Sequence, residues 1–193
     1  KEVIVSRGEL VEIGGAFRVP DILAASGAKM KEVGTTNRTR VSDYEAAIGP
    51  KTALLLKVHT SNFKVVGFTE ETSIAELAAL AAPRGVPVVV DWGSGDLIEL
   101  SAFGVRDERP VGALLAQGAD LVTFSCDKLL GGPQAGLAVG RDDLVARMRR
   151  DPMARILRLD RLQIAALRET LAGYATGRAA VEEHLFHDAD LAR

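Results

Sequence analysis

Short apolar runs alternate along the chain with stretches in which apolar residues recur at helical spacing. The runs predict strands, and glycine, proline and capping residues mark where strands and helices end. We expect strands over residues 2–5, 30–33, 53–59, 86–90, 119–124 and 135–139. We expect helices over residues 9–14, 19–26, 43–48, 72–83, 111–117 and 141–187, the last with breaks near Asp151-Pro152 and Gly173.

Several predicted strands are apolar along almost their whole length rather than at every second position. The run from Val86 to Val90 contains no polar side chain at all. Strands of this kind are buried on both faces, which is typical of parallel sheets sandwiched between helices. We therefore predict an α/β fold with a mostly parallel sheet and helices on both faces.

Three residues with ionisable side chains that could act in catalysis or ligand binding stand where apolar runs end, namely His59, Asp91 and Lys128. In open α/β sheets, ligands bind beyond the carboxyl ends of the strands. Side chains gathered at that edge make a ligand site more probable than the same residues scattered over a surface. We expect these three to belong to one site.

Lys128 lies between the apolar run 119–124 and the glycine-rich turn that contains Gly131 and Gly132. A lysine at this point can leave the strand end and meet a bound aldehyde. That placement suits a Schiff-base lysine that holds pyridoxal phosphate (PLP). The alternative is a solvated surface lysine.

A PLP site also needs a carboxylate at the pyridine nitrogen and a ring against the cofactor face. Asp91 suits the first role, although a capping or turn aspartate is the alternative. His59 suits the second role, or a hydrogen bond to the substrate. The alternative is a histidine whose hydrogen bonds are satisfied within the core or a loop.

The cofactor phosphate needs small polar residues and backbone N–H groups. Ser125, Gly131 and Gly132 are candidates, and each also suits a plain turn. Cys126 is the only cysteine and reads better as a small packed residue than as a nucleophile. We predict no metal site, because His184 and His187 do not recur with Cys126 in a metal-ligand spacing.

Composition narrows the class of protein. The 193 residues are 47% hydrophobic and 26% charged with a net charge of -2, which indicates a globular protein without a basic field for DNA, RNA or membrane. There is no secretory signal and no apolar run of the roughly 20 residues that span a bilayer. We expect a cytoplasmic protein, and a fragment of a longer one, because Lys1 already lies in a strand.

Longer motifs in the same order resemble the bacterial selenocysteine synthases, the L-seryl-tRNA(Sec) selenium transferases. The motifs are Arg7-Gly-Glu-Leu-Val-Glu-Ile-Gly-Gly15, Phe17-Arg-Val-Pro-Asp21, Val33-Gly-Thr-Thr-Asn-Arg-Thr39, Lys57-Val-His-Thr-Ser-Asn62, Val66-Gly-Phe-Thr69, Gly93-Ser-Gly95 and Asp127-Lys-Leu-Leu-Gly-Gly-Pro-Gln-Ala-Gly136. The resemblance implies the fold of type I PLP-dependent enzymes, with Lys128 as the aldimine lysine and Asp91 as the pyridine partner.

The implied reaction converts seryl-tRNA(Sec) to selenocysteinyl-tRNA(Sec), with selenophosphate as the selenium donor. It runs by β-elimination through an aminoacrylyl intermediate, followed by selenium addition. Lys128 is then a base for the seryl α-proton, and Asp127 assists the leaving hydroxyl or controls the donor. Arg155 and Arg158 match positions associated with the donor anion and would share a helical face if that segment is helical. A solvated charged face is the alternative.

The resemblance further implies a homo-oligomer, a decamer built from dimers. Residues 1–150 would form the PLP-binding large domain without its N-terminal part, and residues 151–193 would begin the small domain or connecting helices. The family's tRNA-binding domain would precede Lys1. Two positions depart from the family pattern: Cys126 replaces a glycine, and Trp92 replaces a small apolar residue. A related PLP lyase acting on a small amino acid or amino sugar acid, without tRNA, is the alternative function, and a non-catalytic binding module on the same fold is a third.

Overall fold

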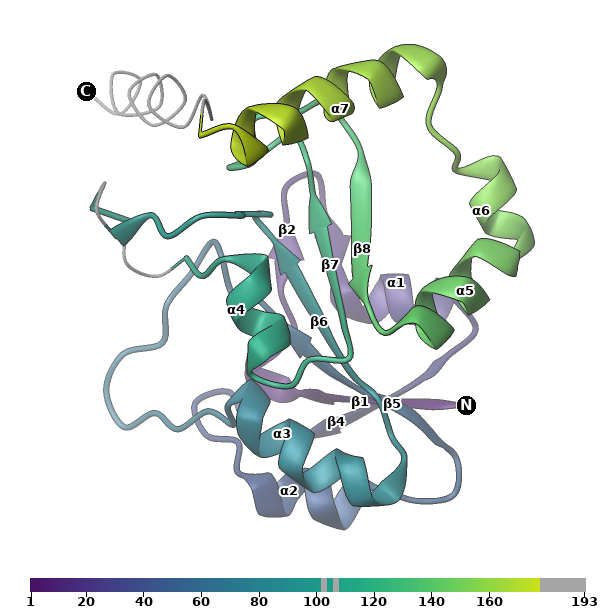
Figure 1. Ribbon diagram of the computed structural model, residues 1–193. Helices are drawn as coiled ribbons and strands as arrows, with labels where there is room; N and C mark the ends of the chain where they lie inside the picture. The colour runs from purple at the N-terminus through teal and green to yellow at the C-terminus, as the bar shows by residue number, and fades with distance from the viewer. Residues whose placement is uncertain (102–103, 106–107, 178–193) are drawn as a thin grey trace. The chain divides into compact units, whose positions relative to one another are not determined.

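A computed structural model describes residues 1–101, 104–105 and 108–177 of the chain (Figure 1). The chain divides into two compact units, each assembled from two segments. The first unit comprises Lys1–Trp92 and Leu114–Val122, and the second comprises Gly93–Ala113 and Thr123–Arg193. The predicted helical pattern beyond residue 177, with His184 and His187, lies outside the described residues.

Parallel strands form the centre of the first unit. β4 (Lys29–Val33) and β5 (Thr52–Val58) pair in parallel with β1 (Glu2–Ser6) from either side. β6 (Val88–Gly93) pairs in parallel with β5, and the start of β7 (Leu121–Ser125) follows it in the sheet. This arrangement confirms the prediction of a mostly parallel sheet.

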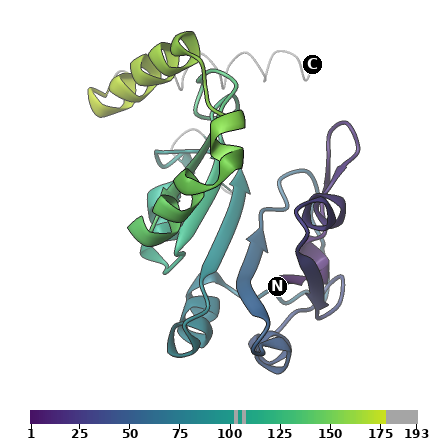
Figure 2. The same cartoon turned by 90° about the vertical axis from the view of Figure 1, so that its right-hand side faces the viewer.

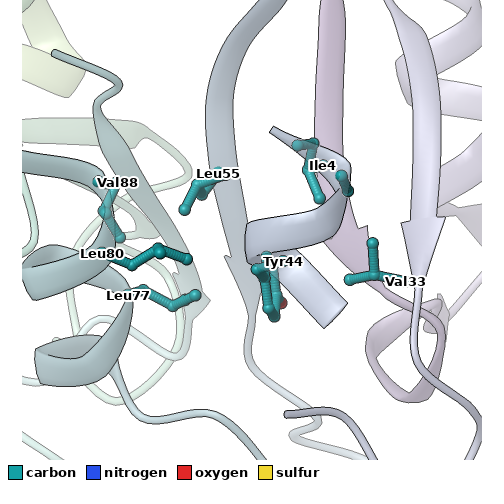
Figure 3. Packing of buried hydrophobic residues seen from close by; sticks show 9 residues of the cluster. Ile4, Val33, Tyr44, Leu55, Leu77, Leu80 and Val88 are labelled. Atoms are coloured by element: carbon teal, nitrogen blue, oxygen red, sulfur yellow. The ribbon is translucent and has the colours of Figure 1, made fainter. Parts of the chain in front are cut away.

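Helices cover this sheet on both faces, as the apolar strands predicted. Ile4 packs with residues of α2 (Val41–Ala47) and α3 (Ile74–Ala81), including Tyr44 and Leu77 (Figure 3). Val5, the next residue of β1, belongs to a second cluster with Val19 of α1 (Val19–Ala25). Because successive strand residues point to opposite faces, the two clusters lie on opposite faces of the sheet.

The helix predicted over residues 9–14 is wrong. The 3-10 helix η1 (Arg7–Glu9) is followed by an antiparallel hairpin of β2 (Glu12–Ile13) and β3 (Phe17–Arg18). Glu12 and Ile13 pair with Arg18 and Phe17, so they are extended and not helical. Gly15 and Ala16, with positive φ angles of 77° and 65°, form the turn between the two strands.

Other boundaries differ by a few residues. α2 begins at Val41 with Arg40 as its N-cap, so Ser42 is not the cap, whereas Ser73 caps α3 through a capping box with Glu76. β6 continues through Asp91 to Gly93 instead of ending before it. The 3-10 helix η2 (Ala82–Arg84) extends α3, and α4 (Val111–Ala116) matches its predicted range closely.

In the second unit, the end of β7 is followed in the sheet by β8 (Gly136–Gly140), and three separate helices come next along the chain (Figure 2). These are α5 (Asp142–Arg150), α6 (Pro152–Ile156) and α7 (Arg161–Ala175). The predicted break at Asp151-Pro152 is confirmed. The break predicted at Gly173 is wrong, since α7 runs through it, and the chain instead leaves the helix after Ile156 until Asp160 caps α7. Among the described helices, none is long and apolar enough to cross a bilayer.

Candidate active site

The predicted lysine stands on a hydrogen-bonded turn, residues 126–132, which we call the lysine turn. The Gly131 N–H donates to the Lys128 carbonyl at 2.9 Å, and the Gly132 N–H donates to the Cys126 carbonyl at 2.7 Å. The Cys126 N–H donates to the Ala135 carbonyl at 2.9 Å and closes the base of the turn. Lys128 and Asp127 are both exposed at its tip. The turn therefore presents the lysine amine from a fixed backbone.

Two glycines at or just after the end of β6 lie near the lysine turn. A Cβ atom built on Gly93 would lie 3.7 Å from Lys128 Nζ, so the backbone of Gly93 is the neighbour of the amine. Gly95 has a φ of 75°, and any side chain there would collide with the Ser125 carbonyl. Only glycine fits at residue 95, which explains why the Gly93-Ser94-Gly95 motif accompanies the lysine.

Contacts that sequence reasoning did not predict support the lysine turn. Tyr174 of α7 donates its hydroxyl to the Leu130 carbonyl at 3.1 Å, with the Leu129 carbonyl at 3.4 Å. The Leu129 N–H donates to the Ser94 carbonyl at 3.2 Å, and the Ser94 hydroxyl donates to Glu108 at 2.6 Å. These contacts join residues far apart in sequence, and nothing local in the sequence indicates them.

Cys126 is fully buried, and burial, with a smaller contribution from Asp127, raises the pKa of its thiol. A buried protonated thiol fits the reading of a packed residue and not a nucleophile. The structure places Gly131 and Gly132 in the turn itself, with both N–H groups already bonded inside it. A phosphate could use those donors only by displacing these bonds. Ser125 is half-buried at the end of β7.

His59 and Asp91 lie at the carboxyl ends of neighbouring strands, as predicted. The His59 N–H donates to the Asp91 carbonyl at 2.9 Å, immediately after the register pair of Val58 and Asp91. The His59 ring stacks on Trp92 with centroids 3.9 Å apart and planes inclined by 6°. One face of the imidazole is thus covered by Trp92.

A buried ion pair that the sequence did not reveal holds the end of β5. Lys57 Nζ donates to Glu9 Oε1 at 2.8 Å, and the Val58 N–H donates to Glu9 Oε2 at 2.9 Å. Burial raises the pKa of Glu9, although Lys57 and the Val58 N–H oppose the shift. Burial alone would lower the pKa of Lys57, but Glu9 and Glu71 outweigh it and raise that pKa. Both residues sit inside resemblance motifs, which is the only signal that could have drawn attention to them.

A cavity of about 320 Å³ opens in the first unit above this ion pair. Its walls include Ser6, Glu9, Arg38, Lys64 and Glu71. It contains none of the predicted cofactor residues, so it does not enlarge the candidate site.

The two predicted anion-binding arginines do not share a helix. Arg155 lies in α6, whereas Arg158 follows the end of that helix, and both are exposed. Arg155 and Arg158 therefore do not share a helical face, although they are close in sequence.

The residues present fit a PLP cofactor. Within the second unit, an exposed lysine amine projects from a fixed turn beside glycine, with no competing thiolate. Within the first unit, a carboxylate residue and an aromatic pair end adjacent strands. Among the described residues, no cluster of three or more histidine, cysteine or acidic side chains could hold a metal ion.

Solved structures with the same fold include D-glucosaminate-6-phosphate ammonia-lyase, with a TM-score of 0.74 and 26% identity over 93% of this chain and 44% of that one. An aspartate aminotransferase from Thermus thermophilus matches with a TM-score of 0.67 and 21% identity over 95% of this chain and 46% of that one. These likenesses confirm the predicted type I PLP-dependent fold.

Curated relatives carry the name L-seryl-tRNA(Sec) selenium transferase. The relative from Moorella thermoacetica is 56% identical over 95% of this chain and 39% of its own length. The relative from Rhizobium meliloti (strain 1021) is 59% identical over 90% of this chain and 37% of its own length. The chain thus spans about two fifths of the length of these relatives.

The family model described as "SelA: L-seryl-tRNA selenium transferase" matches residues 1–186. Together with the fold, this match supports PLP as the cofactor, while the residues that bind it stay a prediction. The chain belongs to the L-seryl-tRNA selenium transferase family.

Proposed function

We propose that the whole protein converts L-seryl-tRNA(Sec) to L-selenocysteinyl-tRNA(Sec), with selenophosphate as the selenium donor and PLP as the cofactor. The observation that carries the proposal is the Lys128 amine, which is exposed on a hydrogen-bonded turn beside Gly93. Family membership then selects this reaction among those that the fold supports.

Bound PLP supplies an electron sink for the charge that develops at the substrate α-carbon. Lys128 holds the cofactor and moves the proton at the seryl α-carbon, first as base and finally as acid. Asp127 assists proton transfer to the β-hydroxyl, which leaves as water. Selenium then bonds to the β-carbon, and hydrolysis of the phosphorus–selenium bond releases phosphate. Asp91 keeps the proton on the pyridine nitrogen, and His59 covers the cofactor face.

Selenophosphate is an anion, and its binding calls for cations. Arg155 and Arg158 are exposed, and among the described residues neither forms an ion pair. Guanidinium groups present paired N–H donors that match the oxygens of a phosphate. We assign both to the selenium donor, and Ser125 to the cofactor phosphate. Gly131 and Gly132 join it only where the phosphate displaces the hydrogen bonds that their N–H groups make within the turn.

The protein acts as a homo-oligomer built from dimers, and a decamer is the form that the resemblance implies. Val66 and Phe68 are both 90% exposed on the loop after β5, which suits a surface that another subunit covers. The substrate is a tRNA, so the cytoplasm is the compartment that we propose.

A PLP lyase acting on a small amino acid or amino sugar acid is the second candidate. The likeness to D-glucosaminate-6-phosphate ammonia-lyase favours it, because that structure shares both fold and some sequence. Lys128 and Asp91 would serve either reaction, but Arg155 and Arg158 favour an anionic donor.

The test is incubation of the full-length enzyme with seryl-tRNA(Sec) labelled in the serine, with and without selenophosphate. The expected product is labelled selenocysteinyl-tRNA(Sec), formed only with the donor. Failure to form it, together with release of ammonia from a small amino acid or amino sugar acid, would favour the lyase.

A further inference from the structure

Helix α7 contacts the lysine turn and the residues just after it at three points. Gln163 Nε2 donates to the Gln134 carbonyl at 3.1 Å. Leu167 is only 7% exposed, and its Cδ1 lies 3.6 Å from a Cβ atom built on Gly132. The third contact is the hydroxyl of Tyr174 described above. At about 100° per residue, positions 163, 167 and 174 lie within about 40° of one another, so one face of α7 meets the turn.

The side chain of Gln163 makes two hydrogen bonds, which together determine how its amide is turned. Its Oε1 accepts the Asp160 N–H at 3.2 Å and completes a capping box with the Asp160 carboxylate at the start of α7. Its Nε2 donates to the Gln134 carbonyl. A backbone N–H can only donate and a carbonyl can only accept, so an amide turned the other way would lose both bonds. One side chain therefore joins the start of α7 to the chain that follows the lysine turn.

The Gln134 end of this link lies next to the base of the lysine turn. Ala135, the next residue, accepts the Cys126 N–H at 2.9 Å, and the Cys126 carbonyl accepts the Gly132 N–H at 2.7 Å. Gln163 is thus bonded to the same short stretch of backbone that closes the turn. The position of this stretch affects how the turn presents Lys128.

The Asp160 end of the link belongs to the segment that carries Arg158. Helix α6 ends at Ile156, and residues 157–160 connect it to α7. Leu159 is half-buried, whereas Arg158 and Asp160 on either side of it are exposed. So short a connection has little reach, and the place where α7 begins therefore limits where Arg158 can lie.

We propose that Gln163 is a positioning residue that aligns the donor-binding segment 157–160 with the lysine turn. The proposal rests on the function proposed above, in which Arg158 binds selenophosphate. Through Gln163, the segment that holds the donor anion and the turn that carries Lys128 are attached to one helix. Loss of this link weakens donor binding although Gln163 itself touches neither the donor nor the cofactor.

Gln163→Glu breaks one of the two hydrogen bonds and keeps the other. A carboxylate oxygen still accepts the Asp160 N–H, so the capping box remains, but a carboxylate cannot donate to the Gln134 carbonyl. Ala165→Glu is the matched control, because it adds the same charge at an exposed position of the same helix.

Hydrogen exchange of the full-length holoenzyme measures the lysine turn directly. Peptides that contain Cys126 and Gly132 should exchange about two- to tenfold faster in Gln163→Glu, the effect of losing one hydrogen bond, and at the wild-type rate in Ala165→Glu. Inorganic phosphate, used in place of the donor, should slow exchange of both segment 157–160 and the turn in wild type. In Gln163→Glu it should protect segment 157–160 alone. No protection in wild type, or equal protection of the turn in both proteins, would overturn the proposal.

Steady-state kinetics at saturating seryl-tRNA(Sec) give the second measurement. KM for selenophosphate should rise about two- to tenfold in Gln163→Glu and stay unchanged in Ala165→Glu. A rise in both variants would indicate a charge effect and overturn the role of Gln163. Wild-type enzyme that forms no selenocysteinyl-tRNA(Sec) would overturn the proposed function and this inference with it. Normal product formation, with a lysine turn that exchanges equally in wild type and Gln163→Glu, would overturn the role of Gln163 alone.

Discussion

Lys57 Nζ lies 2.8 Å from Glu9 Oε1, although the two residues are 48 positions apart in sequence. The second carboxylate oxygen of Glu9 accepts the Val58 N–H, so a single buried side chain links the segment after β1 to the end of β5. His59 directly follows this end of β5. The same buried contacts that stabilise the first unit therefore also hold the backbone next to a candidate site residue.

Removal of one partner of this pair should be costly. Glu9→Leu leaves Lys57 buried with only the exposed Glu71 nearby at 3.4 Å, and we expect a loss of about 3–5 kcal/mol in the free energy of unfolding. The double variant Glu9→Leu/Lys57→Met should recover part of that loss, because no uncompensated charge remains, while the buried Val58 N–H still lacks its Glu9 acceptor. Urea unfolding of the full-length protein measures both.

Glu32→Gln is the matched control. It breaks the exposed ion pair of Arg7 and Glu32, whose atoms are 3.1 Å apart, and should cost less than about 1 kcal/mol. Equal losses for Glu9→Leu and Glu32→Gln would show that the buried pair has no special weight.

Asp96 should give stability a pH dependence. It is fully buried, Oδ2 has no hydrogen-bond partner among the described residues, and burial raises its pKa above the ordinary 3.8. The folded protein binds this proton more tightly than the unfolded chain, so the free energy of unfolding falls as pH rises from 3.8 through the raised pKa.

Asp96→Asn removes that component. The stability difference between wild type and variant should therefore decline with rising pH across this window and become constant above it. Glu9 also has a raised pKa, but its contribution is common to both proteins and cancels. A difference that does not vary with pH would contradict the assignment.

Tyr174 should control how well the lysine turn is held. Tyr174→Phe removes the hydroxyl that donates to the Leu130 carbonyl and should cost about 0.5–1.5 kcal/mol of stability. We also expect a lower PLP occupancy, read from the visible absorbance of the lysine-bound cofactor. Thr170→Ala removes an exposed hydroxyl from the same helix, which bonds only within α7, and should leave occupancy unchanged. Equal PLP occupancy in Tyr174→Phe and Thr170→Ala would show that the hydrogen bond from Tyr174 to the lysine turn does not affect cofactor binding.

Arg155 should contribute to selenium donor binding. Arg155→Ala removes a charge-assisted contact to an anion, worth about 1.5–3 kcal/mol, so KM for selenophosphate should rise about tenfold or more. PLP absorbance should stay the same. Arg149→Ala, an exposed arginine of α5, is the control and should leave KM unaltered. A rise in KM for both variants would indicate a general charge effect.

Local patterns predicted much of the fold and the candidate site. Apolar strands gave the parallel sheet, and the rule about strand ends correctly put His59 beside Asp91. The helical spacing of residues 9–14 was misleading, because Glu12 and Ile13 are extended and pair with β3 across the turn at Gly15 and Ala16. Propensity cannot anticipate such a tertiary choice.

Contacts between distant residues were beyond sequence reasoning. The buried carboxylate of Glu9 and the hydroxyl of Tyr174 find their partners 48 and 44 residues away. Trp92 stood out only as a departure from the family pattern, and its stacking on His59 depends on the register of β5 and β6. The domain boundary at residue 150 stays a prediction.

The most direct test of the account is to identify the lysine that carries the cofactor. Borohydride reduction of the full-length holoenzyme fixes PLP on its lysine, and peptide mass spectrometry locates it. We predict modification of Lys128, absent in Lys128→Ala together with the visible absorbance and retained in the exposed control Lys51→Ala. Modification of a different lysine, or unchanged absorbance in Lys128→Ala, would contradict the account.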